Sequence, residues 1–155
     1  MELETKRLRI IPCTEETVEI AISQNYDNGP QISNHLKKLK EDPTHLYWGT
    51  WLVVRKTDGI VLGDIGFKGK PDENKVVETG YGFLESYWNN GYATEAVEAL
   101  IQWAFNTSQV NKIVAETLQN NHGSIRVLEK LGMKKTSMTE TMINWEIDEM
   151  NSTPN

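Results

Sequence analysis

Two periods of hydrophobic and polar residues alternate along this chain, and together they predict a succession of strands and helices. In one segment, apolar residues recur at spacings of four, three and four: Ala93, Val97, Leu100 and Ala104. This spacing predicts a helix with one buried face. Glu95 lies in the first turn of that helix, where a carboxylate suits the positive end of the helix dipole.

The segment before this helix alternates with a period of two, which predicts a β-strand. One strand face carries bulky side chains and the other is nearly bare around one carboxylate: Val77, Thr79, Tyr81 and Phe83 against Glu78, Gly80 and Gly82. A bare strand face often marks a place where a ligand or another backbone comes close. The alternative interpretation is a surface strand on which Glu78 has no function.

The rest of the chain follows the same two periods, with turns at clusters of Gly, Pro, Asp and Asn. Strands are predicted at residues 3–12, in a hairpin over 48–67, at 77–83, at 112–118, and as a pair within 133–150. Helices are predicted after an N-cap at Thr14, and at 32–39, 93–104 and 124–131. The order β-α-α-β-β-β-α-β-α-β-β predicts an α/β fold with a mixed, mostly antiparallel sheet and helices on both faces.

Length and charge narrow the class of protein. The 155 residues are predicted to form one domain over 1–150, followed by a disordered tail at 151–155. The net charge of −6 argues against nucleic acid as a partner, because nucleic acid requires a concentrated basic surface. An acidic surface suits a cationic substrate such as an amine.

The sequence also bounds compartment and cofactor chemistry. No apolar run reaches membrane-spanning length, and the first residues lack the apolar core of a signal peptide. Cys13 is the single cysteine, and a buried bystander thiol is the simplest interpretation. His35, His45 and His122 are scattered without metal-ligand spacing. We therefore expect a cytoplasmic protein with no membrane partner and no metal cofactor.

A turn of small residues connects the predicted strand 77–83 to the helix at 93–104. Gly91 lies at the centre of this turn, after Asn89 and Asn90. Backbone N–H groups of a tight turn and of a helix N-terminus converge on such a position, where the helix dipole favours an anion. Nothing in the turn is a strong phosphate-binding side chain, so we expect the backbone to bind the anion.

Two separated motifs resemble those of the GNAT N-acetyltransferases, in the branch of the ribosomal-protein N-terminal acetyltransferases. Residues 88–93 (Trp-Asn-Asn-Gly-Tyr-Ala) resemble the acetyl-CoA pyrophosphate loop of that family, and residues 121–133 resemble its second cofactor motif. Residues 4–8 resemble its first strand, and the order of elements fits over nearly the whole chain. The resemblance implies acetyl-CoA as cosubstrate. It also implies that a primary amine, from a protein N-terminus or a small molecule, attacks the thioester directly. We expect the protein to be a monomer or a homodimer.

Two departures from the family pattern bear on the site. Asn89 stands where the branch usually has glycine, and Asn is the non-glycine residue best suited to a positive φ. Leu128 stands where other branches carry a tyrosine that protonates the leaving thiolate. The resemblance to the ribosomal-protein branch leaves Ser124 as the candidate for that role.

The resemblance places the cofactor contacts at the end of the strand, in the turn and at the start of the later helix. These residues are Phe83, Leu84, Trp88, Asn89, Asn90, Gly91, Tyr92, Ala93, Thr94, Asn121 and Ser124. A backbone N–H near Phe83 or Leu84 is expected to bind the oxyanion. The alternative interpretations are that Phe83 is a core residue and that Asn121 caps a helix by accepting from the N–H of Ser124.

Acetyl transfer to an amine requires a neutral amine, donors for an oxyanion and a proton for the leaving thiolate. Glu78 is the first candidate base, acting directly or through a water, and Glu116 is the second. Either is also explained as an exposed strand carboxylate. Ser124 shares a helical face with Leu128 and Leu131, which directs its hydroxyl inward, although a serine at a helix start often satisfies backbone N–H groups.

The acceptor site has the weakest signal. In the family fold the first two helices and their connection line it, which makes Tyr26, His35, Tyr47 and Trp48 candidates for substrate binding. Each is equally explained by ordinary packing. The rival function from another class is a non-catalytic module that binds or senses acyl-CoA.

Overall fold

The computed structural model describes residues 1–149, and the predicted tail at 151–155 lies outside them. Within these residues, eight strands form one sheet. The strands are β1 (Leu3–Glu4), β2 (Leu8–Pro12), β3 (Thr50–Arg55), β4 (Val61–Phe67), β5 (Val76–Phe83), β6 (Lys112–Leu118), β7 (Lys134–Met138) and β8 (Met142–Asp148). The helices are α1 (Val18–Ile22), α2 (Gln31–Glu41), α3 (Tyr92–Asn106) and α4 (His122–Lys130), with short 3₁₀ helices η1 (Pro43–His45) and η2 (Glu85–Tyr87).

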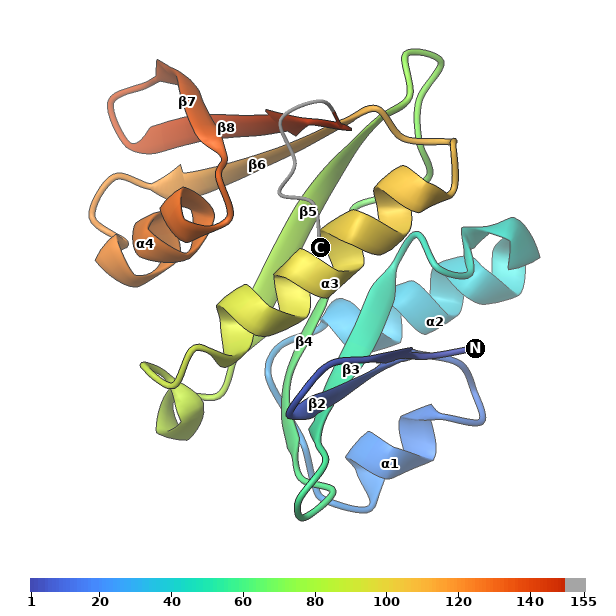
Figure 1. The fold of residues 1–155 in the computed structure, drawn as a ribbon. Coiled ribbons are helices and arrows are strands. Elements are labelled where there is room, and N and C mark those ends of the chain that lie inside the picture. Colours follow the sequence, from blue (N-terminus) through green and yellow to red (C-terminus); the bar gives the residue numbers. More distant parts are fainter. Residues whose placement is uncertain (150–155) are drawn as a thin grey trace.

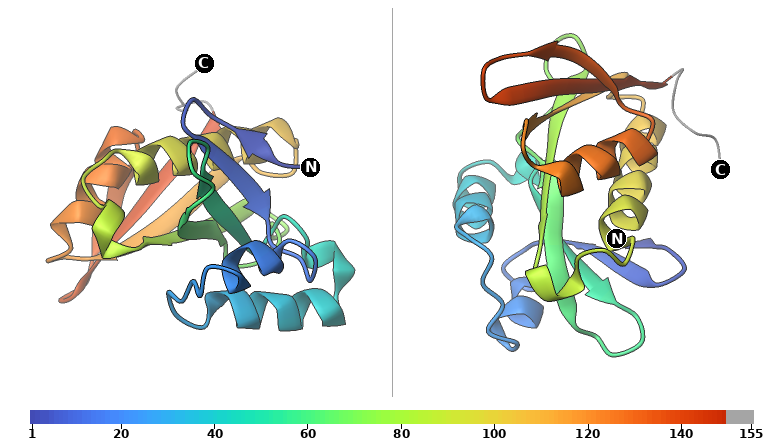
Figure 2. Two further views of the ribbon diagram at one scale, coloured as in Figure 1. Left: turned by 90° about the horizontal axis from the view of Figure 1, so that it is seen from below. Right: turned by 90° about the vertical axis from the view of Figure 1, so that its left-hand side faces the viewer.

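The sheet has the order β1-β2-β3-β4-β5-β6-β8-β7, and its described neighbours pair antiparallel except for β5 and β6, which are parallel. Helices α3 and α4 cover one face, and α1 and α2 cover the other (Figures 1 and 2). The predicted α/β fold with a mixed, mostly antiparallel sheet and helices on both faces is therefore confirmed.

The parallel pair β5–β6 is short, and this shapes the centre of the molecule. The two strands pair only from Val76 opposite Lys112 to Glu78 opposite Val114. Beyond Glu78 the strands diverge, while β5 continues to pair with β4 as far as Phe83. A gap therefore opens in the sheet toward the carboxyl end of β5, the end that leads into η2 and α3 (Figure 1).

The first predicted strand, 3–12, is wrong in one respect, because it is two strands that fold back on each other. Leu3 pairs with Ile10 across a turn. The hydroxyl and N–H of Thr5 close this turn through hydrogen bonds with the backbone of Leu8. Glu95 of α3 accepts hydrogen bonds from Thr5 and from the backbone N–H of Arg7, so a contact distant in sequence fixes the reversal.

The first helix begins later than predicted. Thr17, not Thr14, precedes α1 as its N-cap. The N–H of each threonine donates to the hydroxyl of the other, at 2.8 and 3.0 Å. This reciprocal bonding holds the segment before Val18 in a turn.

The hydrophobic core lies mainly between the sheet and α3. Val97, Leu100 and Ala104 are fully buried, as the spacing in this helix predicts. Trp103 of α3 lies within an aromatic cluster, with its ring centroid 5.2 Å from that of Trp51 and 5.1 Å from that of Trp48. A smaller cluster on the other face holds α1 against β3 through Cys13, Val18, Ala21 and Leu52.

Candidate active site

The turn between β5 and α3 has the backbone conformation that the sequence predicts. Asn89 has φ of 65° and Gly91, the N-cap of α3, has φ of 79°. The expectation that position 89 tolerates Asn at a positive φ is met. No side chain caps the start of α3 among the described residues, so its first N–H groups face outward from the turn. The side chain of Asn90 donates to the carbonyls of Tyr87 and Trp88, which stiffens the loop.

Cationic side chains beside this turn escaped sequence analysis. A Cβ atom built on Gly91 would lie 3.4 Å from a guanidinium nitrogen of Arg7. The same guanidinium lies 4.4 Å from the ring centroid of Tyr92 and pairs with Glu95 at 2.7 Å. Arg55 donates to the Tyr92 hydroxyl at 3.5 Å. The β1–β2 reversal brings Arg7 here, so neither its sequence position nor the turn motif indicated it.

The gap between β5 and β6 exposes backbone groups of β5. The Glu78 carbonyl accepts from Lys68, just after β4, and the Leu84 N–H donates to Leu62 of β4. Alternation therefore directs the N–H and C=O of Tyr81 and Phe83 toward the gap. The Leu84 N–H donates to the Leu62 carbonyl and is therefore not free to bind an oxyanion. The Phe83 N–H stays a candidate, while the Phe83 carbonyl accepts from the Trp88 indole at 2.7 Å. The Phe83 side chain is buried in the core.

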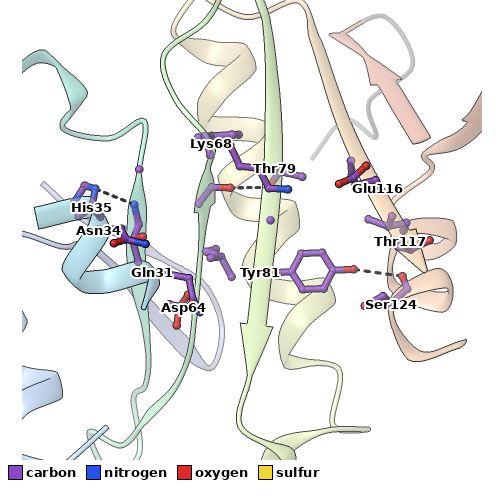
Figure 3. Close-up of a pocket in the computed structure, with 18 of the residues that line it drawn as sticks. Gln31, Asn34, His35, Asp64, Lys68, Thr79, Tyr81, Glu116, Thr117 and Ser124 are labelled. Carbon is purple, nitrogen blue, oxygen red and sulfur yellow. Dashed lines mark hydrogen bonds between the residues drawn. The ribbon is translucent and has the colours of Figure 1, made fainter. Parts of the chain in front are cut away.

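A cavity of about 640 Å³ lies at this gap and reaches both faces of the sheet (Figure 3). Four residues proposed from sequence line it: His35, Glu116, Asn121 and Ser124. Leu128, which stands where other branches have tyrosine, also lines it and is fully buried. Polar residues of α2 that the sequence analysis did not select, Gln31, Asn34 and Lys38, form part of its wall. Their spacing of three and four residues, opposite the apolar stripe of α2, is the signal that could have found them.

A tyrosine approaches Ser124 from β5 rather than from α4. The Tyr81 hydroxyl crosses the gap and donates to the Ser124 carbonyl at 3.3 Å (Figure 3). Burial raises the pKa of Tyr81, and the Ser124 side chain partly offsets that shift. Tyr81 therefore carries its proton at neutral pH. Asn121 caps α4 by accepting from the Ser124 N–H at 3.1 Å, as the capping interpretation predicts, while also lining the cavity.

The two candidate bases have different surroundings. Glu78 forms an ion pair with Lys68 at 2.8 Å and is not among the residues that line the cavity. Glu116 lines the cavity, as do Thr117 and Ser124 (Figure 3). The register Glu78 opposite Val114 places both carboxylates on the sheet face that α1 and α2 cover. The geometry thus favours Glu116, the second choice from sequence, over Glu78.

The four candidates for acceptor binding separate into core and cavity residues. Tyr47 and Trp48 pack in the aromatic cluster around Trp103 and do not line the cavity, which argues against the predicted substrate role. His35 lines the cavity but is fixed by the backbone, because its Nδ1 accepts from the Thr50 N–H at 3.2 Å. Its Nε2 therefore carries the proton and donates to the carbonyl of Cys13 at 2.8 Å. Tyr26 is not a lining residue, but its hydroxyl donates to Asp64, which lines the cavity.

Three expectations from composition concern the cysteine, metal ions and membrane-spanning helices. Cys13 is buried, and burial raises the pKa of its thiol to about 12, so it is not a nucleophile at neutral pH. Within residues 1–149, no group of three or more His, Cys, Asp or Glu side chains is arranged to hold a metal ion. In the same part of the chain, no helix is long and apolar enough to cross a membrane.

The model of the acetyltransferase (GNAT) domain matches residues 8–134 of the chain. The chain belongs to the GNAT family of acetyltransferases. YkkB of Bacillus subtilis, an uncharacterized protein, is 32% identical over 146 residues, which cover 85% of this chain and 84% of YkkB. YjdG of the same species, an uncharacterized N-acetyltransferase, is 40% identical over 83 residues. That match covers 54% of this chain and 49% of YjdG, or about half the length of that relative.

Solved structures share the fold at low sequence identity. The ribosomal-protein-S5-alanine acetyltransferase of Vibrio fischeri superposes with a TM-score of 0.78 at 16% identity, over 99% of this chain and 100% of that one. RimL, a ribosomal L7/L12 α-N-protein acetyltransferase in complex with coenzyme A, has a TM-score of 0.77 at 13% identity, over 96% and 98%. At these identities the likeness shows the GNAT fold, but it does not identify the molecule that this chain acetylates.

Proposed function

We propose that this GNAT protein transfers an acetyl group from acetyl-CoA to a primary amine by direct attack. The observation that carries the proposal is the gap between β5 and β6, which opens toward the end of β5 that leads to the turn at Gly91 and holds a cavity lined from both faces of the sheet. A cosubstrate with an anionic and an extended part fits this arrangement. The turn offers backbone N–H groups beside Arg7, and the edge of β5 offers hydrogen bonds along the gap.

The residues around the gap supply what acetyl transfer needs. The Phe83 N–H is the proposed oxyanion donor at the splayed end of β5. Ser124 and the protonated Tyr81 phenol adjoin each other at the cavity wall, where one of them donates to the departing thiolate. Glu116 is the proposed base, because it lines the cavity while Glu78 is held by Lys68.

The acceptor is a primary amine of a protein N-terminus or of a small molecule. Two structural neighbours are acetyltransferases of ribosomal proteins, which supports the first class by likeness of fold only. We propose a cytoplasmic enzyme of one domain over residues 1–150, acting as a monomer or homodimer. The rival, a non-catalytic acyl-CoA-binding module, would keep the turn and the gap but would not need cavity carboxylates.

A binding and turnover experiment tests the proposal. Calorimetric titration should detect binding of acetyl-CoA. A thiol-release assay with acetyl-CoA should then show turnover with at least one member of a panel of amines that includes peptide N-termini, polyamines and amino acid amides. Binding without turnover over the whole panel would favour the non-catalytic module, and absence of acetyl-CoA binding would refute both functions.

A further inference from the structure

A buried carboxylate, Asp64 of β4, lines the cavity and has no role in the scheme above. Only 4% of its surface is exposed. It pairs with Leu52 on β3 and Gly82 on β5, and Leu52 belongs to the cluster under α1. Alternation therefore places Asp64 on the sheet face that α1 and α2 cover, the same face as Glu116. This is the wall of the cavity on the side of Gln31 (Figure 3).

The hydrogen-bond partners of Asp64 are neutral. The Tyr26 hydroxyl donates to its Oδ2 at 2.6 Å, and the side chains of Gln31 and Asn28 also approach it as donors. All three belong to the connection between α1 and α2 or to the first residue of α2. Within residues 1–149, no Lys, Arg or His side chain forms an ion pair with it. Burial raises the pKa of Asp64.

A buried anion without a countercharge is costly, because its desolvation is not offset by a cation. Gly80 and Gly82 of the neighbouring strand carry no side chains, but Lys68 and Asn28 cover them, with Lys68 Cε 3.4 Å and Asn28 Nδ2 3.1 Å from the positions of built Cβ atoms. A cation therefore reaches Asp64 through the cavity that this residue lines, not over the glycines.

The other charges lining the cavity do not supply this countercharge. Lys68 forms an ion pair with Glu78. The remaining Lys, Asp and Glu side chains that line the cavity are two carboxylates, Asp64 and Glu116, and one cation, Lys38.

We propose that Asp64, oriented by the Tyr26 hydroxyl, binds the ammonium group of a cationic amine acceptor in the half of the cavity under α2. This inference rests on the proposed function, and it names the substrate class as amines that arrive positively charged. Asp64 is the anionic anchor that selects such an acceptor over an uncharged molecule of the same size. Tyr26, a substrate-binding candidate from sequence, acts by orienting the carboxylate.

The first test measures equilibrium binding without acetyl-CoA, so its outcome is independent of acetyl transfer. Propylamine, which is an ammonium ion at neutral pH, and uncharged 1-propanol are titrated into the free protein while backbone amide signals of β4 and α2 are followed by NMR. Propylamine is expected to bind at least ~10-fold more tightly than 1-propanol, as a hydrogen bond to a charged group provides. Equal affinities in the wild-type protein would overturn the proposal.

Variants separate the anchor from a purely structural role in holding the α1–α2 connection. Asp64→Asn should abolish the preference for propylamine while leaving the affinity for 1-propanol unchanged. Glu73→Gln, which removes an exposed carboxylate from the loop before β5, is the matched control and should keep the preference. Tyr26→Phe, which keeps the carboxylate, should reduce the preference and serves as the readout if Asp64→Asn does not fold. A preference that survives both Asp64→Asn and Tyr26→Phe contradicts the proposal.

The second test uses turnover. With 1,3-diaminopropane as acceptor, one ammonium group can stay on Asp64 while the other nitrogen loses its proton and attacks the thioester. Asp64→Asn is then expected to raise the KM for the diamine at least ~10-fold, with the dissociation constant for acetyl-CoA unchanged. An unchanged KM in a variant that binds acetyl-CoA overturns the anchor and leaves the acetyltransferase proposal intact. Loss of acetyl-CoA binding in the wild-type protein would refute the proposed function instead, while the NMR titration would still decide on Asp64.

Discussion

On the face of the sheet covered by α3 and α4, apolar side chains fill the space between the layers, and Val97, Leu100 and Ala104 have no exposed surface. On the face covered by α1 and α2, the central strands carry glycines and the carboxylates Asp64 and Glu116 instead. The gap between β5 and β6 connects the two faces. One face thus supplies most of the hydrophobic core, and the other carries the charged groups on which our proposals for ligand binding rest.

The largest expected effect is on the turn at the carboxyl end of β5. Gly91→Val places a β-branched residue at φ of 79°, which costs roughly 1–3 kcal/mol, and puts a side chain where backbone N–H groups must meet the anion. We expect no acetyl-CoA binding detectable by calorimetry in a folded variant. Gly59→Val is the matched control, because Gly59 has φ of 74° with no atom within 4 Å of a built Cβ. Unchanged acetyl-CoA affinity in Gly91→Val would remove the turn from the site.

The apolar face should dominate stability. Leu100→Ala leaves a cavity in a fully buried position and is expected to lower the free energy of unfolding by roughly 2–5 kcal/mol. Leu36→Ala on α2, where the side chain is only partly buried, should lower it by less. Urea denaturation measures both. Equal losses in the free energy of unfolding would contradict the conclusion that the face covered by α3 and α4 contributes most to stability.

Ser124 and Tyr81 lie where the two faces meet. If they donate to the departing thiolate, Ser124→Ala or Tyr81→Phe should lower kcat by roughly 10²- to 10⁴-fold, with little change in acetyl-CoA affinity. The pair of single variants shows which hydroxyl is the donor. A wild-type kcat in both would leave Ser124 as a residue at the start of α4 and Tyr81 as a bridge between β5 and α4.

The strands, the helix periodicities and the turn were predictable because each depends on residues close in sequence. The spacing of Val97 and Leu100 and the positive φ of Asn89 are local properties, and both agree with the structure. Arg7, Asp64 and Tyr81 were missed because their roles depend on contacts between distant segments. The β1–β2 reversal carries Arg7 to the turn, strand register sets the face of Asp64, and the divergence of β5 from β6 brings Tyr81 to Ser124.

The surroundings of two aromatic candidates for acceptor binding also depend on distant segments. Tyr47 and Trp48 follow α2 and η1 in the chain, and their rings pack in the cluster around Trp103. A large apolar ring gains more from burial than from a place in a polar cavity. The residues of α2 that line the cavity, such as Gln31 and Asn34, are polar, and their sequence pattern is that of an ordinary solvent-exposed helix face.

The two carboxylates Glu116 and Glu78 offer a finer test of the polar face. Glu116→Gln is expected to lower kcat/KM by about 10²-fold at neutral pH, and Glu78→Gln by much less, because Lys68 already holds that carboxylate. The Glu116→Gln deficit should shrink as the pH rises, since solution then supplies neutral amine. A larger loss in Glu78→Gln would restore the first choice from sequence. A Glu116→Gln deficit that is constant with pH would indicate that Glu116 positions the positive charge instead.

The smallest expected effect concerns His35, which joins α2 to the polar face while remaining neutral. Burial lowers the pKa of His35 below its usual 6.5, and burial likewise lowers that of His45. Below about pH 6.5 the unfolded chain therefore binds more protons than the folded protein. The contribution of neutral His35 to the free energy of unfolding should be complete above that pH. It should decrease as the pH falls from 6.5 toward the pKa of His35 in the folded protein, by about 1.4 kcal/mol for each unit by which that pKa is lowered.

Urea denaturation at pH 5 and pH 8 measures this loss in the wild-type protein and two variants. His35→Gln should be less stable than the wild type at pH 8, because the hydrogen bonds to Thr50 and Cys13 are altered. Its free energy of unfolding should, however, decrease less than that of the wild type between pH 8 and pH 5. His122→Gln, at an exposed position, is the control and should lose as much as the wild type. Asp64 acts with the opposite sign, since its raised pKa makes the folded protein bind the extra proton. Because Asp64 is present in all three proteins, its contribution cancels in the comparison. A His35→Gln protein with the full wild-type pH dependence would assign the loss to His45 or to other groups.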